Sequence, residues 1–171
     1  DTLVNSGDIS AAGNLLISAG ATASDITLGG NITNTAGHTS LVAGRSILQN
    51  ANITASGGAM TVDLQATAGV VTMTDGTTLQ TSGGNVRVSS VGDITLGSID
   101  ARAAANRSTP GLSLQSDATT PWGSVSLLSS TGSIVDNATE SVAGTVDVYA
   151  NELRLNAVTN GKSVGSNSNA I

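Results

Sequence analysis

The stretch Asp25-Ile26-Thr27-Leu28-Gly29-Gly30-Asn31-Ile32-Thr33 decides the fold, because both of its halves return along the chain. The first half recurs as Asp93-Ile94-Thr95-Leu96-Gly97, and the second half recurs 21 residues later as Asn52-Ile53-Thr54. Each half alternates apolar and polar side chains, which is typical of a β-strand that buries one face. Recurrence at a spacing of about 20–50 residues indicates a repeat architecture.

Three sets of such runs predict three short strands in every repeat. The first set consists of Leu15-Leu16-Ile17, Leu41-Val42, Met60-Thr61-Val62, Val86-Arg87-Val88, Val125-Ser126-Leu127 and Val146-Asp147-Val148. The second set consists of Ile26-Thr27-Leu28, Ile47-Leu48, Val71-Thr72-Met73, Ile94-Thr95-Leu96, Ile134-Val135 and Leu153-Arg154-Leu155. The third set is shorter and lies near Ile32, Ile53, Leu79 and Ile99. Turn glycines precede the first set at Gly13, Gly37, Gly58, Gly84, Gly123 and Gly144.

A repeat of about 21–26 residues is too short for a four-stranded propeller blade, and it lacks the fixed Asn or Cys of a leucine-rich repeat. It fits one coil of a parallel β-helix, in which equivalent strands stack about 4.8 Å apart. We therefore expect one all-β domain over residues 1–171, a parallel β-helix (solenoid) of about six to seven coils with three strands per coil. Residues 160–171 are interpreted as the start of another coil, a linker or a frayed end.

The composition agrees with this fold. Aromatic residues make up 1% of the chain and charged residues 11%, while 39% of residues are hydrophobic and mean hydropathy is +0.15. Scarce Leu, Glu, Lys and Arg exclude a helical bundle or a coiled coil, and the hydropathy excludes a disordered chain. Aliphatic side chains suit a lumen too narrow for rings, and glycine, of which there are 21, suits the turns.

The charge limits the partners of this chain. Its net charge is −6 and its isoelectric point is about 4.3, so it does not concentrate on nucleic acid or on anionic lipid. The chain has no cysteine, and therefore no disulfide framework. No apolar run reaches about 18 residues, so no helical membrane insertion is expected. The chain begins in the middle of the repeat pattern, and we expect a processed product or a piece of a longer protein.

One segment, residues 102–121, interrupts the spacing by about one coil. Insertions in solenoids form loops on one face, often the binding face. Exposed Trp and Arg are common binding anchors, so Arg102, Arg107 and Trp122 are the candidate binding residues. The alternative is a harmless bulge, or an irregular extra coil built on Leu112 and Leu114.

A second local expectation concerns the turns before the third set of strands. Aligned by the repeat, Asn31, Asn52, Thr78 and Ser98 lie above one another. This column predicts a ladder of side-chain hydrogen bonds from coil to coil, or else turn residues that were chosen separately.

The sequence offers little for catalysis or metal binding. The single histidine, His38, follows a turn glycine and has no distinctive Ser or Asp partner. Zinc needs more His or Cys than the chain holds. No cofactor is expected; calcium between turn aspartates is the alternative, and these aspartates are Asp8, Asp25, Asp93 and Asp136. The two glutamates, Glu140 and Glu152, do not form the placed pair of carboxylates that a glycosidase needs.

Several short stretches resemble the filamentous haemagglutinin-like exoproteins, the large β-strand-repeat surface adhesins of Gram-negative bacteria. They are Gly-Asp-Ile-Ser at 7–10, Gly-Asn-Leu-Leu-Ile-Ser at 13–18, Ala-Gly-Arg-Ser-Ile at 43–47 and Gly-Asp-Ile-Thr-Leu-Gly-Ser-Ile-Asp-Ala at 92–101. The resemblance covers roughly residues 3–158. It implies a right-handed parallel β-helix, export to the cell surface and a role in adhesion. It implies no particular receptor-binding residue.

The function expected from these observations is a non-catalytic shaft segment of a large secreted or cell-surface bacterial adhesin. Its expected partners are neighbouring coils of the same long chain or identical copies stacked end to end, with a host or cell-surface ligand as a further partner. Two alternatives stay open. One is a self-assembling subunit of an S-layer, sheath or extracellular filament, and the other is a polysaccharide-active β-helix enzyme.

Overall fold

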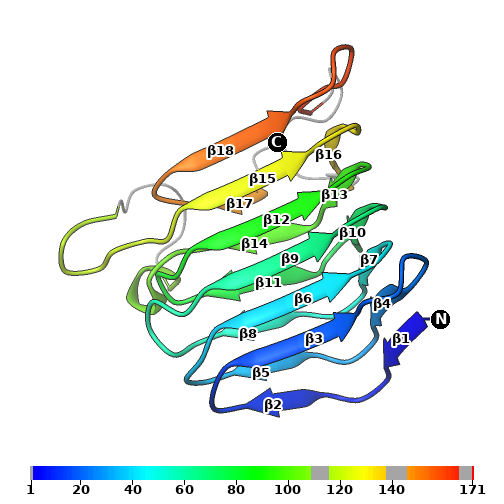
Figure 1. Ribbon diagram of the computed structural model, residues 1–171. Coiled ribbons are helices and arrows are strands. Elements are labelled where there is room, and N and C mark those ends of the chain that lie inside the picture. Colours follow the sequence, from blue (N-terminus) through cyan, green and yellow to red (C-terminus); the bar gives the residue numbers. More distant parts are fainter. Residues whose placement is uncertain (1, 109–115, 138–145, 166–170) are drawn as a thin grey trace.

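The computed structural model describes residues 2–108, 116–137, 146–165 and 171. Its strands stack into a solenoid with three parallel sheets, and the chain climbs from one end to the other (Figure 1). One sheet, sheet A, contains β1 (Thr2–Asn5), β4 (Asp25–Leu28), β7 (Ile47–Gln49), β10 (Val71–Met73), β13 (Ile94–Leu96) and β16 (Ile134–Asp136).

The other two sheets repeat the same order. Sheet B contains β2 (Ile9–Ala11), β5 (Ile32–Asn34), β8 (Ile53–Ala55), β11 (Thr78–Thr81), β14 (Ser98–Asp100) and β17 (Val148–Tyr149). Sheet C contains β3 (Leu15–Ala19), β6 (Thr39–Ala43), β9 (Val62–Ala66), β12 (Val86–Ser90), β15 (Val125–Ser129) and β18 (Leu153–Ala157). The expected all-β parallel solenoid with three strands per coil is therefore confirmed, and six coils are complete.

The lumen is filled by aliphatic side chains stacked on their own kind. In sheet A the register aligns Ile26, Ile47, Val71, Ile94 and Ile134, and all five are fully buried. Burying a side chain of this size stabilises the fold by about 1.5–3 kcal/mol. Because the strands alternate, the next residue of each strand faces outward and is partly exposed; these residues are Thr27, Leu48, Thr72, Thr95 and Val135.

Each corner of the solenoid carries a ladder of hydrogen bonds that runs along its axis. Before sheet B, the backbone N–H of Asn31 donates to the Asp8 carboxylate at 2.8 Å, and that of Asn52 donates to the Asn31 amide oxygen at 3.0 Å. The N–H of Thr78 then donates to Asn52 at 2.8 Å. The expected ladder thus exists, although it joins side chains to the main chain. It does not reach Ser98, whose N–H donates to a backbone oxygen.

The same arrangement recurs before the other sheets. Before sheet A, the Asp93 carboxylate accepts the N–H of Ser133 at 2.7 Å. Before sheet C, Asn85 accepts the N–H of Ser124 at 2.8 Å. A polar residue directly before a strand therefore provides an acceptor for the next coil, and this explains why Asp, Asn and Ser recur there.

Close stacking of the coils explains the turn glycines before sheet C. A Cβ on Gly123 would lie 1.9 Å from the carbonyl oxygen of Gly84, which is closer than any real contact. Of the glycines expected at this turn, Gly58 is wrong. Met60 occupies the position that stacks between Gly37 and Gly84. Gly58 instead forms a local turn with a φ of +67°. Gly144 lies outside the described residues.

The last coil differs from the expected assignment. Val148 belongs to sheet B, where it pairs with Ile99 of β14, and β18 belongs to sheet C, where Leu153 pairs with Val125 of β15. The repeat spacing predicts sheet C for Val148 and sheet A for Leu153, and both predictions are wrong. The physical reason is a second long connection, from Asp136 at the end of β16 to Val148 at the start of β17. It lengthens this coil, so the strands after it come later in the sequence than the regular spacing predicts.

The chain continues past the sixth coil. Val164 forms an isolated parallel bridge with Ile134, and the N–H of Gly165 donates to the Ile134 carbonyl at 2.8 Å. Residues 163–165 therefore lie where the sheet A strand of a seventh coil would begin. Residues 166–170 lie outside the described part of the chain.

Candidate functional site

Two of the three candidate residues, Arg102 and Arg107, meet at Asp100 in β14 of sheet B. Arg102 donates to both carboxylate oxygens of Asp100 in β14, from Nε at 3.0 Å and from Nη2 at 2.7 Å. Arg107 forms a second ion pair with Asp100 at 3.3 Å and donates to the Arg102 carbonyl at 2.8 Å. The guanidinium of Arg102 also covers the ring of Tyr149 at 3.7 Å, a cation–π geometry.

This cluster is largely buried, and burial together with the ion pairs shifts the pKa values of its members. The side chains of Asp100 and Arg102 are 10% and 12% exposed. Burial raises the pKa of Asp100, but the hydrogen bonds and positive charge of Arg102, helped by the charge of Arg107, outweigh it and hold this pKa below its ordinary value. Burial lowers the pKa of Arg107.

Trp122 holds the other end of the insertion. Its indole N–H donates to the side-chain oxygen of Asn106 at 3.0 Å, and its backbone N–H donates to Ser116 at 2.9 Å. The Trp122 side chain is buried. The structure thus brings Arg102 and Arg107 together on Asp100, whereas the Trp122 indole binds Asn106. Of the insertion, residues 109–115, which include Leu112 and Leu114, lie outside the described part.

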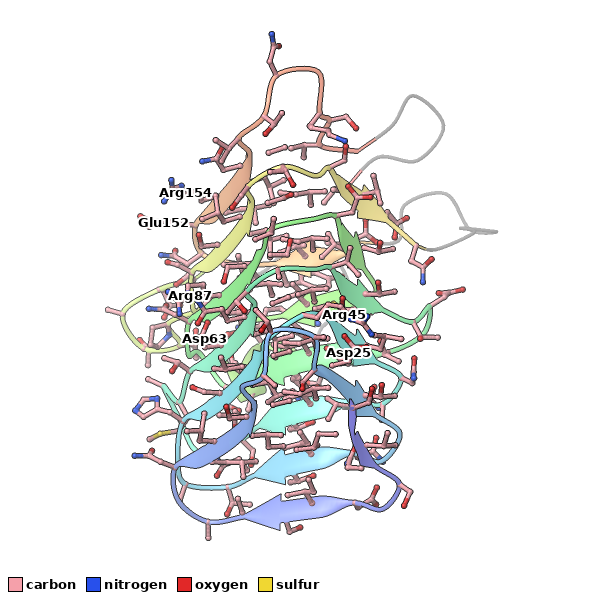
Figure 2. All side chains as sticks on the ribbon, turned by 45° about the vertical axis from the view of Figure 1, so that its right-hand side comes forward. Asp25, Arg45, Asp63, Arg87, Glu152 and Arg154 are labelled. Atoms are coloured by element: carbon pink, nitrogen blue, oxygen red, sulfur yellow. The ribbon has the colours of Figure 1, made fainter. Side chains whose placement is uncertain are left out.

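A different feature offers an open surface. A groove of about 620 Å³ lies over sheet C, across the first residues of β9, β12, β15 and β18. Its charged lining residues are Asp63, Arg87, Glu152 and Arg154. Figure 2 shows these four side chains on one side of the solenoid, away from the pair Asp25 and Arg45. A second groove of about 450 Å³ adjoins it and shares Arg87, Ser126 and Arg154.

The charges in this groove are unequally paired. Arg87 donates to both carboxylate oxygens of Asp63, at 2.7 and 2.6 Å, and this hydrogen bonding raises the pKa of Arg87. The pair is exposed, with 57% of the Arg87 side chain open to solvent, and such pairs contribute only about 0–1 kcal/mol. Among the described residues, Arg154 forms no ion pair, and neither does Glu152.

The groove is the feature that sequence reasoning missed. The register places Arg87 opposite Ser126, and Ser126 opposite Arg154, so the two arginines share one column with Asp63. This alignment can be read from the sequence only when Leu153-Arg154-Leu155 is assigned to the same sheet as Val86-Arg87-Val88. The long connection before β17 hid that assignment.

His38 has a structural place in a corner ladder. Its ring Nδ1 lies 3.1 Å from the backbone nitrogen of Thr61, which donates to it, and its own backbone N–H donates to Asn14 at 3.1 Å. It therefore serves as an acceptor for the next coil, as Asn85 does in the same column. In the described part of the chain no three His, Asp or Glu side chains gather as metal ligands.

The turn aspartates also bind main-chain groups. Asp8 and Asp93 each accept an N–H of the next coil, and Asp25 accepts that of Ser46 at 3.0 Å. Asp25 also binds Arg45, whose hydrogen bond lowers the pKa of this carboxyl. These oxygens stabilise the turns.

Comparison with known proteins identifies no relative: no family model matches the chain, and no curated protein or solved structure matches it. None of the helices among the described residues is long and apolar enough to span a membrane.

Proposed function

We propose that this chain is a non-catalytic shaft segment of a large secreted or cell-surface bacterial adhesin of the filamentous haemagglutinin-like kind. The observation that carries the proposal is the unbroken parallel register of all three sheets through six coils. In such a solenoid each coil contacts only its neighbours, so the molecule extends by adding coils. Its function is then mechanical, since it holds binding parts at a distance from the cell.

The chemistry of the surface supports this role. The three corner ladders tie each coil to the next, and the histidine, the turn aspartates and the Asp100 cluster all stabilise the stack. The scarcity of charge and of aromatic residues suits a scaffold better than a catalytic site.

The second candidate is a self-assembling subunit of an S-layer, sheath or filament. The two outermost strands of sheet C favour it, because their inward residues match in kind. Leu15, Ile17 and Ala19 of β3 correspond to Leu153, Leu155 and Ala157 of β18, and an unpaired strand edge is a template for another copy.

Surface labelling of intact source cells tests the shaft proposal. An antibody raised against this chain should label intact cells, and external protease should remove the label. Labelling that appears only after lysis would contradict export. Electron microscopy of the purified chain tests the alternative, for which long end-to-end fibres are expected and which dispersed short rods would contradict.

A further inference from the structure

The two adjoining grooves over sheet C form one extended surface that crosses β9, β12, β15 and β18. The first groove has a volume of about 620 Å³ and the second of about 450 Å³. Arg87, Ser126 and Arg154 line both grooves. Equivalent strands lie about 4.8 Å apart, so a ligand in contact with all four strands must be extended along the solenoid axis.

The surface offers two guanidinium groups to such a ligand. Arg154 is exposed and forms no ion pair with the described residues. Arg87 binds Asp63 through Nε and Nη2, and both partners are partly exposed, so the ligand can compete for this arginine. The planar fork of an arginine matches a carboxylate in geometry. The two arginines lie two strands apart in one column, roughly 9–10 Å by the strand spacing.

The rest of the lining contains both apolar residues, such as Leu128 and Leu153, and neutral hydrogen-bonding side chains. The hydrogen-bonding side chains include Thr61, Gln65, Asn85, Ser89, Ser124 and Ser126. Hydroxyl and amide groups of this kind suit a ligand that carries many hydroxyls. The acidic neighbours Asp63 and Glu152 oppose a densely anionic ligand, as does the net charge of −6.

Peptides and nucleic acids fit this surface less well. Both edges of β12 and of β15 are already paired with neighbouring strands, so an extended peptide finds no free strand edge there. The lining contains no aromatic side chain on which a base could stack.

We propose that this surface binds an extended glycan with sparsely spaced carboxylates, which Arg87 and Arg154 recognise. The inference does not depend on the shaft role, because any stack of these coils carries the same surface. A chain that fails to label the cell surface could still bind the glycan, and a shaft segment could lack binding.

Isothermal titration calorimetry with the intact chain tests the proposal, with a hyaluronan oligosaccharide of six to eight sugars as the probe, because it carries a carboxylate on every second sugar. Binding is expected for this probe and is expected to weaken at least about tenfold for its methyl-esterified form, which has lost the carboxylates. Arg154→Gln should weaken binding by about tenfold as well. The matched control is Arg45→Gln, which removes an exposed arginine on another face and should leave affinity unchanged.

A gain-of-binding variant separates recognition from loss of fold. Glu152→Gln removes a negative charge from the groove and should tighten binding of the hyaluronan oligosaccharide severalfold. Absence of binding by the native chain, or equal binding by Arg154→Gln, would overturn the site. Oligoglutamate bound as tightly as the hyaluronan oligosaccharide would overturn the assignment to a glycan.

Discussion

The side-chain oxygen Oδ1 of Asn52 lies 2.8 Å from the backbone nitrogen of Thr78 in the next coil and accepts its hydrogen bond. This contact is one step of the ladder at the corner before sheet B. We expect Asn52→Ala to lower the free energy of unfolding by about 1 kcal/mol, because one N–H loses its protein acceptor. Asn52→Asp keeps an acceptor and should cost much less. Urea unfolding measures both, and equal losses would contradict the ladder.

Close approach of the coils makes a specific prediction for the turn before sheet C. Gly123→Ala places a Cβ 1.9 Å from the backbone oxygen of Gly84, so the coils must separate. We expect a loss of about 2–3 kcal/mol. Gly13 lies in the same column at the N-terminal end and has nothing within 4 Å of its Cβ position. Gly13→Ala should therefore be nearly neutral. Thermal unfolding of both variants measures the difference, and comparable losses at the two positions would refute the steric argument.

Gln49 is a polar side chain of the lumen that is poorly satisfied. Gln49 is fully buried, and among the described residues its Oε1 has no hydrogen-bond partner. Its neighbours in the column are Leu28 and Met73. Gln49→Met should raise the free energy of unfolding by about 1–2 kcal/mol, since it removes an unsatisfied acceptor at similar volume.

The matched control for this change is Gln80→Met, on the outward side of β11, where only a small change is expected. Chemical denaturation of the two variants gives the comparison. A destabilised Gln49→Met chain would show that the amide makes a contribution which methionine cannot replace.

The cluster around Asp100 predicts a dependence on pH. The pKa of Asp100 is lowered in the folded chain from its ordinary value of 3.8, so the carboxylate contributes stability above that value. This contribution is lost as the pH falls through the lowered pKa. Asp100→Asn should cost about 2 kcal/mol at pH 7, and the difference from the native chain should shrink below pH 3.8. Thermal unfolding from pH 2.5 to 7 measures it; a difference that is constant with pH would argue against the ion pairs.

How far the sequence predicts this structure depends on how local each feature is. The repeated words around Ile26 and Ile94 indicate the strands, their inward faces and the coil, because all three follow from period-two alternation and a regular spacing. The corner ladder at Asn31 and Asn52 follows from the same alignment. These features need only the residues of one coil and its neighbour.

Features that depend on irregular connections could not be predicted in this way. The long connection before β17 shifted the last coil, so Arg154 was not aligned with Arg87 and the groove was missed. The partner of Arg102 and Arg107 was missed for a related reason. Asp100 lies in a regular strand, and only the path of the insertion brings both arginines onto it.

The measurement that tests the shaft proposal most directly is the length and sequence of the mature, intact product as isolated from its source. A shaft segment predicts a much longer polypeptide, in which further three-strand coils of the same spacing flank these residues. A mature product scarcely longer than the 171 residues of this sequence would contradict it.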